Sequence, residues 1–227
     1  MIFALADQIS QVREAVAEAA VAAGRAADEV TIVAVSKTFP REDVDAAFAS
    51  GLRVFGENRV QEATAKFATP LPHGASVHLI GQLQTNKVKQ ALSVFDCIES
   101  VDRVSLINTL QKEAAKLDRV VAVLVQVNIA GEEQKSGCST QDAADLIERI
   151  GQASHLRCDG MMTIAPLVND PEETRPTFAA LRELRDSLGG SAMLPMLSMG
   201  MSNDYRIAIS EGATHIRLGR AIFGNRG

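Results

Sequence analysis

A lysine follows directly on an apolar run near the start of the chain. Residues 30–35 read Val-Thr-Ile-Val-Ala-Val, and Lys37 comes two residues later, ahead of Pro40. A nearly continuous β-branched run of this length is typical of a strand buried on both faces of a parallel sheet. An amine tethered to the end of such a strand can have a lowered pKa and can form a Schiff base with a carbonyl compound. Taken alone, the pattern also fits a solvent-exposed lysine that merely follows a strand.

Two short loops near the other end of the chain have the composition of anion-binding loops. One is the run 198–202, Ser-Met-Gly-Met-Ser, and the other is the run 219–221, Gly-Arg-Ala. Glycine lets the backbone approach an anion closely, while hydroxyl and guanidinium groups donate hydrogen bonds to it. Such loops are also common as plain turns, so neither alone identifies a site. The candidate anion ligands are Ser198, Gly200, Ser202, Gly219 and Arg220.

Arg217 precedes the second loop in the sequence Ile216-Arg217-Leu218. Because side chains alternate along a strand, Ile216 and Leu218 share one face and Arg217 takes the other. Its guanidinium stays protonated, so it can donate a hydrogen bond but cannot act as an acid. The alternative is an arginine paired with a structural carboxylate.

The elements that must position these residues are short strands separated by helical segments. Strict alternation of this kind predicts a parallel sheet with right-handed crossovers. Eight units in 227 residues fit an α/β fold with one closed (β/α)8 barrel spanning residues 1–227, and a doubly wound open sheet is the alternative. An Ala-rich helix over residues 4–24 precedes the first strand. The expected strands are 30–35, 52–55, 77–80, 94–98, 120–127, 156–162, 194–197 and 215–218.

In a barrel of this kind, functional residues lie in the loops after the strands, and phosphate is often bound after strands seven and eight. Lys37 follows strand one, and Glu57 and Asn58 follow strand two. The two Gly-containing loops follow strands seven and eight, which favours a phosphate site there. The polar run 132–135 after strand five is interpreted as a solvated loop. The alternative is that this loop contacts a client protein.

Composition and cysteine spacing indicate which partners, metal sites and cell compartments are expected. Hydrophobic residues make up 46% of the chain, the formal net charge is −5, and no long run of basic residues suggests nucleic-acid or membrane-surface binding. The three cysteines, Cys97, Cys138 and Cys158, are far apart and form no CxxC pair, which predicts neither a metal site nor disulfides. The N-terminus does not have the pattern of a signal peptide, and no run approaches the roughly 20 apolar residues of a membrane span. We therefore expect a cytoplasmic protein.

Seven motifs occur in an order that resembles the pyridoxal phosphate homeostasis proteins, the YggS and PROSC type. The resemblance covers nearly the whole chain. The motifs are VAVSKT at 33–38, FGENRVQE at 55–62, HLIGQLQTNK at 78–87, VNIAGEEQKSG at 127–137, GMMTI at 160–164, LSMGMS at 197–202 and RLGRAIFG at 217–224.

This resemblance implies a barrel similar to the N-terminal domain of alanine racemase, the fold-type III group of pyridoxal phosphate proteins. It implies that Lys37 is the Schiff-base lysine, that Arg217 faces the pyridine nitrogen and that Asn58 lies near the cofactor. The five loop residues named above would hold the phosphate. The sequence departs from the pattern twice: many relatives have Thr or Ser in place of Arg220, and the tyrosine that many carry near residues 225–227 is missing.

The same resemblance bears on catalysis. Pyridoxal phosphate acts as an electron sink, and an arginine beside the ring nitrogen disfavours its protonation because like charges repel. A racemase needs an acid and a base on opposite faces of one carbon. Alanine racemase takes its second base, a tyrosine, from a C-terminal β domain of the partner subunit, and we expect no such domain here. The chain's single tyrosine, Tyr205, lies near the start of an expected helix.

We therefore expect a binding protein without catalytic residues. It would hold pyridoxal phosphate covalently on Lys37, serve intracellular vitamin B6 homeostasis, and supply apo-enzymes through transient contacts. We expect a monomer without metal, nucleic-acid or membrane partners. Two alternatives stay open: a small fold-type III amino-acid racemase, and a barrel enzyme in which Lys37 binds or forms an imine with a phosphorylated metabolite.

Overall fold

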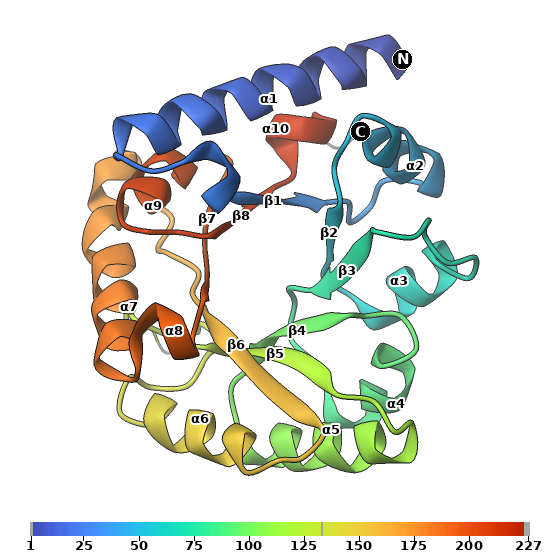
Figure 1. The fold of residues 1–227 in the computed structure, drawn as a ribbon, viewed down its shortest axis with the longest axis vertical. Coiled ribbons are helices and arrows are strands. Elements are labelled where there is room, and N and C mark those ends of the chain that lie inside the picture. Colours follow the sequence, from blue (N-terminus) through green and yellow to red (C-terminus); the bar gives the residue numbers. More distant parts are fainter. Residues whose placement is uncertain (1, 133, 225–227) are drawn as a thin grey trace.

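Eight parallel strands close into a barrel, and helices surround it on the outside (Figure 1). Each strand pairs with the next along the chain, and β8 closes the ring by pairing with β1. The computed structural model describes residues 2–132 and 134–224, so the departure noted at residues 225–227 lies outside the described residues. The strands are β1 (Thr31–Val35), β2 (Val54–Glu57), β3 (Ser76–Leu79), β4 (Cys97–Val101), β5 (Val121–Gln126), β6 (Leu156–Met162), β7 (Met196–Met201) and β8 (His215–Leu218). The predicted (β/α)8 barrel is confirmed.

Apart from the first and the last, the helices connect successive strands, as right-handed crossovers between parallel strands require. Short 3-10 turns cover Ala27–Glu29, Thr85–Lys87 and Pro171–Thr174. The helices are α1 (Ile2–Ala22), α2 (Arg41–Ala49), α3 (Val60–Lys66), α4 (Val88–Ala91), α5 (Val104–Lys116), α6 (Ala143–Gly151), α7 (Arg175–Ser187), α8 (Gly190–Met193), α9 (Tyr205–Ser210) and α10 (Arg220–Phe223).

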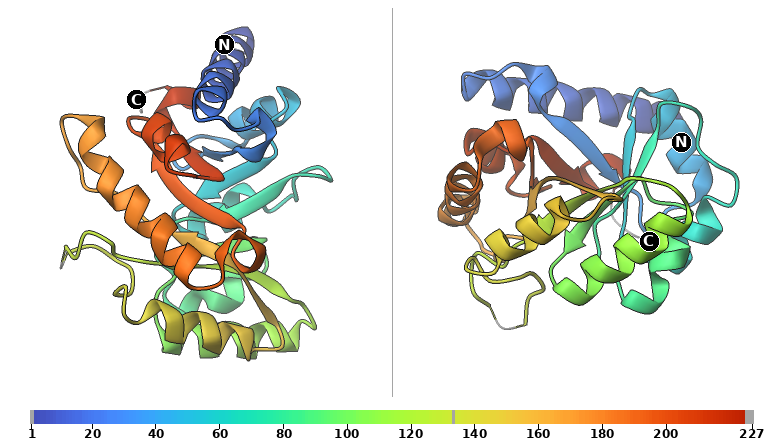
Figure 2. Two further views of the ribbon diagram at one scale, coloured as in Figure 1. Left: turned by 60° about the vertical axis from the view of Figure 1, so that its left-hand side comes forward. Right: turned by 60° about the horizontal axis from the view of Figure 1, so that its bottom comes forward.

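The helix expected ahead of the first strand is α1, which lies along one side of the barrel beside α10 (Figure 2). Ile9, Val12 and Val16 recur at three- and four-residue spacing and are buried, so this helix packs one apolar face against the rest of the molecule. It also contacts α9 and α2. The helix therefore covers the segments that follow β7 and β8.

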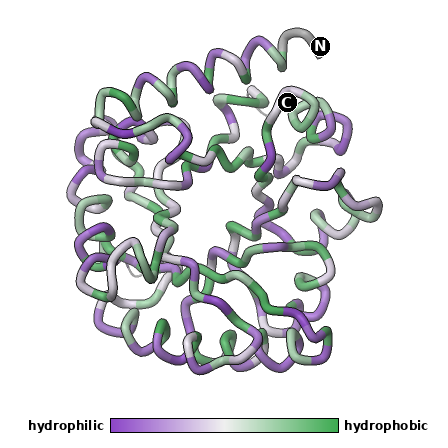
Figure 3. Tube along the Cα trace, in the orientation of Figure 1, coloured by the Kyte–Doolittle hydropathy of each residue, from purple (hydrophilic) through white to green (hydrophobic). Residues whose placement is uncertain are grey.

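The barrel has a continuous apolar layer outside its strands and a more polar interior. Phe55, Ile98 and Leu218 point outward into the layer beneath the helices, where the main core lies. In each strand, the residues adjacent in sequence to these outward-pointing ones point inward, because side chains alternate between the two faces of a strand. Hydrophilic residues recur along the outer sides of the helices (Figure 3). The inward positions are therefore the ones that can carry buried polar side chains.

Several strand boundaries differ from the sequence prediction, and three of the differences matter for the site. β4 covers Cys97–Val101, because Val94 and Phe95 belong to the turn before it although they are apolar. β7 continues to Met201, so Ser198 and Gly200 lie on the strand and not in the loop after it. Likewise Glu57 is the last residue of β2. Polar and glycine residues at a strand end are buried by the surrounding barrel, which a local pattern does not show.

Candidate functional site

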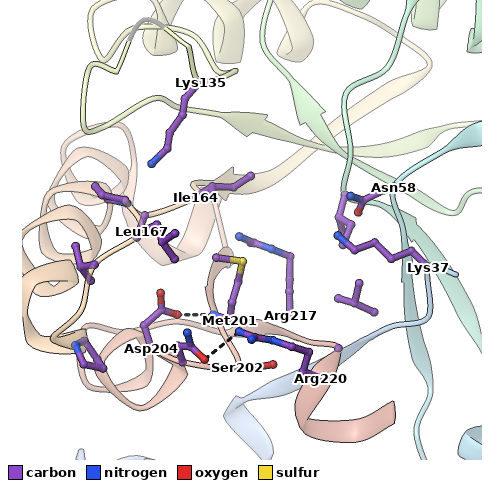
Figure 4. Close-up of a pocket in the computed structure, with 18 of the residues that line it drawn as sticks. Lys37, Asn58, Lys135, Ile164, Leu167, Met201, Ser202, Asp204, Arg217 and Arg220 are labelled. Carbon is purple, nitrogen blue, oxygen red and sulfur yellow. Dashed lines mark hydrogen bonds between the residues drawn. The ribbon is translucent and has the colours of Figure 1, made fainter. Parts of the chain in front are cut away.

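A cavity of about 670 Å³ opens at the carboxyl ends of the strands, the end of the barrel where functional residues are expected (Figure 4). Lys37 and Asn58 reach it from the side of β1 and β2, and Ser202 and Arg220 border it from the side of β7 and β8. The sequence-predicted residues that line the cavity are Lys37, Asn58, Ser202, Arg217, Gly219 and Arg220. One cavity thus brings the lysine and the candidate anion loops together.

Lys37 occupies a tight turn at the end of β1. The turn runs from Ser36 to Phe39, and the Phe39 N–H donates to the Ser36 carbonyl oxygen at 3.1 Å. Ser36 is fully buried, whereas Lys37 is partly exposed and borders the cavity. The turn therefore places an amine at the cavity wall on a rigid strand end.

The two loops expected to bind an anion are hydrogen-bonded to each other. The Arg220 guanidinium donates to the side-chain oxygen of Asn203 at 3.1 Å, and the Ala221 N–H donates to the Ser202 hydroxyl at 3.4 Å. Gly219 separates β8 from α10 and borders the cavity between these contacts. The result is a wall that carries a cation, a hydroxyl and backbone N–H groups, the donor set that suits a phosphate.

Ser198 and Gly200 are not among the residues that line the cavity. Gly200 has φ +91°, and a Cβ there would lie 2.5 Å from the Ala208 Cβ. This glycine is therefore required for the close packing of β7 against α9. Ser198 points into the barrel interior, where it is fully buried beneath the cavity.

Arg217 lies inside the barrel and borders the cavity from below. It thus takes the strand face opposite to that of Ile216 and Leu218, as strand alternation predicted. Its Nη1 donates to the Ser198 Oγ at 2.8 Å, and its Nη2 donates to the Thr163 carbonyl oxygen at 2.8 Å. Burial lowers the pKa of the guanidinium, while the carboxylates of Glu99 and Asp204 oppose that shift. The arginine is thus fixed in orientation by two contacts and has further N–H groups for a ligand.

A buried acid supports Arg217, and sequence reasoning missed it. Glu99 on β4 is fully buried; its Oε2 accepts from the Ser198 Oγ at 2.5 Å and its Oε1 contacts the His78 Nδ1 at 2.7 Å. Burial raises the pKa of Glu99, but His78, Arg217 and Ser198 outweigh it and bring the pKa to about 2. The carboxylate is therefore ionised and balances the charge of Arg217 through Ser198. The contact between Glu99 and Ser198 spans 99 residues of sequence, so no local signal could have revealed it.

Next to this cluster lies His215, whose ring stacks on that of His78 with centroids 6.3 Å apart. Burial lowers the pKa of His215 to about 4; His78 adds to the shift and Glu99 opposes it. The imidazole of His215 is therefore neutral at neutral pH. Below the cavity, the barrel interior therefore holds Glu99 and Arg217, linked through Ser198, and the neutral ring of His215 beside them.

The wall opposite Lys37 was also missed. Ile164 and Leu167, in the segment after β6, present apolar side chains there, and the Leu167 side chain is largely exposed. Lys135 reaches the cavity from the loop after β5 and donates to the Glu132 Oε1 at 2.5 Å. The run 132–135 was interpreted as a solvated loop, yet Lys135 borders the cavity. Its polar composition gave no indication of that position.

Two other features of the described residues limit the chemistry. Within residues 2–132 and 134–224, no group of three or more histidine, cysteine or acidic side chains has an arrangement that could hold a metal ion. In the same part of the chain no helix is long and apolar enough to cross a bilayer. The residues that line the cavity offer an amine on Lys37, a buried guanidinium on Arg217 and hydrogen-bond donors on Ser202 and Arg220.

The comparisons with known proteins agree over nearly the full length of the chain. A family model described as "Alanine racemase, N-terminal domain" matches residues 6–227. A pyridoxal phosphate homeostasis protein from Aquifex aeolicus is 41% identical over 222 residues, which cover 97% of this chain and 97% of that protein. The protein of the same name from Escherichia coli is 35% identical, with 98% of this chain and 97% of that protein covered.

Solved structures with the same architecture fall into two groups. PipY of Synechococcus elongatus, solved with PLP bound, superposes with a TM-score of 0.84 at 36% identity, covering 97% of this chain and 100% of PipY. D-threonine aldolase from Filomicrobium marinum superposes with a TM-score of 0.74 at 15% identity, covering 98% of this chain and 60% of that one. The second likeness shows the fold alone.

Proposed function

The chain belongs to the pyridoxal phosphate homeostasis proteins, within the alanine racemase N-terminal domain family, and from this premise we propose that it binds pyridoxal phosphate and holds it as a Schiff base on Lys37. One observation carries the proposal: Lys37 and the donor groups of Ser202, Gly219 and Arg220 line the same cavity. An aldehyde with an anionic tail can meet both walls of such a cavity at once.

The residues present fit this cofactor. The Lys37 amine would take the aldehyde carbon, and the wall formed by Ser202, Gly219 and Arg220 would take the phosphate. Arg217 lies between the two walls in the view of Figure 4, and its spare N–H groups would face the ring nitrogen. Asn58 borders the same side as Lys37. A cavity of about 670 Å³ is in the range that small-molecule sites occupy.

Ser198 and Gly200 have indirect roles in this proposal. Ser198 holds Arg217 from beneath through the 2.8 Å hydrogen bond. Gly200 lets the end of β7 pack closely on α9, and Ser202 follows directly on that strand end. Both residues would thus shape the site from behind the cavity wall.

We infer that the protein carries the cofactor and does not turn over a substrate. Bound pyridoxal phosphate supplies an electron sink for carbanion chemistry, and a protonated ring nitrogen strengthens that sink. Arg217 would face this nitrogen with a buried cation balanced by Glu99, and it has no acceptor atom for a ring proton. This environment supports binding of the cofactor more than chemistry on it. Such a protein would limit free aldehyde in the cell and pass the cofactor to apo-enzymes.

Racemisation would require a second acid or base across the ring from Lys37. Tyr205, the only tyrosine of the chain, opens α9 and packs against the main core; it is not among the residues that line the cavity. Its position supports the carrier role over the racemase alternative.

The test is to load the purified protein with pyridoxal phosphate and record its absorbance spectrum. We expect a Schiff-base band that Lys37→Ala abolishes, while the matched variant Lys112→Ala, at an exposed position on α5, keeps it. Borohydride reduction followed by peptide mass measurement should place the reduced adduct on Lys37. An adduct on another lysine would contradict the proposal.

The carrier role has a separate test. Loaded protein mixed with an apo-enzyme that requires pyridoxal phosphate should restore that enzyme's activity. Assays on D- and L-amino acids should show no turnover at ordinary enzyme rates, roughly 1 per second or more. Turnover at such rates would favour the racemase alternative even if the Schiff base forms.

A further inference from the structure

The turn that carries Lys37 has an unusual backbone. Its third residue, Thr38, has φ +69°, which places a β-branched residue in the left-handed region. A turn of four residues with a positive φ at the third position normally has Gly or Asn there, because a side chain branched at Cβ clashes with the backbone. Backbone strain of this kind persists only where surrounding contacts enforce it, and it clusters at functional sites.

Side chains of α3 supply contacts on both sides of Lys37. The Glu62 carboxylate accepts from the Thr38 N–H at 2.5 Å, and the Lys66 ammonium donates to the Ser36 carbonyl oxygen at 2.7 Å. The two peptide groups that flank the Lys37 side chain are therefore both held from one helix. Glu62 and Lys66 lie four residues apart, one turn of α3, and the Lys66 Nζ is 3.4 Å from the Glu62 Oε1. We call these two residues the α3 clamp.

Glu57 fixes the α3 clamp from below. Its Oε1 accepts from the Lys66 Nζ at 2.7 Å and from the Ser36 Oγ at 2.8 Å. The Lys66 side chain is only 7% exposed and that of Glu57 is fully buried, so this ion pair is shielded from water. A shielded ammonium with three acceptors, on Ser36, Glu57 and Glu62, has little freedom to move.

Another contact supports the turn from the opposite side. The Phe39 ring stacks on Phe223 of α10 with centroids 5.0 Å apart. This contact anchors the last residue of the turn, but it touches neither peptide group beside Lys37. The α3 clamp, in contrast, contacts the two peptide groups on either side of Lys37 directly.

We propose that the α3 clamp enforces the left-handed conformation of Thr38 and thereby directs the Lys37 amine into the cavity, with Glu62 and Lys66 as positioning residues. The inference rests on the proposed Schiff base at Lys37 and explains how the reacting amine is held ready. Lys66 then acts through its contacts to the turn backbone, and it does not bind the cofactor.

The decisive experiment first removes the side chains of the α3 clamp and then replaces Thr38 with a residue that adopts a positive φ without them. Lys66→Met and Glu62→Leu should each weaken Schiff-base formation at Lys37 about tenfold, the effect of 1.4 kcal/mol on an equilibrium constant, as measured by absorbance titration with pyridoxal phosphate. Adding Thr38→Gly to either variant should restore most of the lost affinity, because glycine adopts a positive φ without support. Glu62→Gln keeps an acceptor for the Thr38 N–H and should lose less than Glu62→Leu.

The controls separate the possible outcomes. Lys112→Met, an exposed lysine on α5, should bind as the unaltered protein does. If Thr38→Gly fails to restore binding in the clamp variants, Lys66 and Glu62 act by charge or direct contact and the inference is wrong. Binding equal to that of the unaltered protein in Lys66→Met would overturn it as well.

A second readout does not need the cofactor. In the cofactor-free protein the Thr38 amide should exchange its hydrogen slowly, and Glu62→Leu should speed that exchange at least tenfold, because this N–H loses its acceptor. Unchanged exchange would contradict the clamp itself. Fast exchange in the variant together with no Schiff base in the unaltered protein would refute only the proposed function.

Discussion

Two glutamates of this barrel are equally buried and behave in opposite ways. Glu57 ends β2 and points outward toward α3, whereas Glu99 on β4 points into the barrel interior; both are fully buried. Burial raises the pKa of the Glu57 carboxyl, and Lys66 and Ser36 offset the rise only in part. The pKa of Glu99 is lowered to about 2 although burial acts on it in the same direction. Burial alone therefore does not decide the direction in which the pKa of these carboxyl groups shifts.

The difference lies in how the donors are distributed over the two carboxylate oxygens and in the charges nearby. Both oxygens of Glu99 are used, one by His78 and one by Ser198, and the charge of Arg217 lies close behind. At Glu57 a single oxygen accepts from both donors, and Oε2 has no hydrogen-bond partner in the described part of the chain. The Glu62 carboxylate adds repulsion. The contacts of Glu99 thus outweigh its burial, while the contacts of Glu57 do not.

The largest expected effect is at Glu99. Glu99→Gln removes the negative charge that balances Arg217, and losing one partner of a buried pair costs about 3–5 kcal/mol of unfolding free energy. The penalty should be complete above pH 4.5 and should shrink as the pH falls toward 2, because the unaltered glutamate then protonates as well. Urea unfolding of both proteins over a range of pH measures the penalty and its dependence on pH. Glu14→Gln, at an exposed position on α1, should change stability by less than about 0.5 kcal/mol.

The next largest effect on stability is expected at His215, which lies in the barrel interior near Glu99. Its pKa falls from 6.5 to about 4 in the folded protein, so the unfolded chain binds a proton that the folded one resists. Stability should therefore decline as the pH falls from 6.5 toward 4, by up to about 3 kcal/mol at 1.36 kcal/mol per pH unit. His215→Asn should remove this slope, and the difference between the two unfolding curves isolates it. A parallel pair of curves over that range would show that the ring is not buried as a neutral group.

The sequence predicted the barrel and its mouth better than the barrel interior. Lys37, Ser202 and Gly219 were found because each follows a short apolar run whose end marks the mouth of the barrel, and local patterns report such ends. Glu99 was not found, because the apolar residues Val94 and Phe95 shifted the expected strand toward the N-terminus and left the acid outside it.

The supporting contacts were hidden for a second physical reason. Ser198 meets Glu99 across 99 residues, and Thr38 meets Glu62 across 24, so neither pair lies within a helix or strand period. Lys66 and Glu62 have the spacing of an ordinary exposed ion pair on a helix. Only the packing of α3 against the β1 turn gives this pair another role.

The smallest effect on stability should occur at Glu57, and its dependence on pH should be opposite to that of Glu99. Because the folded state favours the protonated carboxyl, its contribution to stability is complete below pH 4.5 and is lost as the pH rises through the higher folded pKa. Glu57→Gln mimics the neutral form and still offers an oxygen to Lys66 and Ser36, so at neutral pH it should cost no more than about 1 kcal/mol, the scale of one hydrogen bond. Relative to the unaltered protein, the variant should gain stability as the pH rises above 4.5. Urea unfolding at pH 5 and pH 8 checks this. A penalty at pH 8 as large as that of Glu99→Gln would mean that the two carboxylates are equivalent and that the arrangement of their donors does not distinguish them.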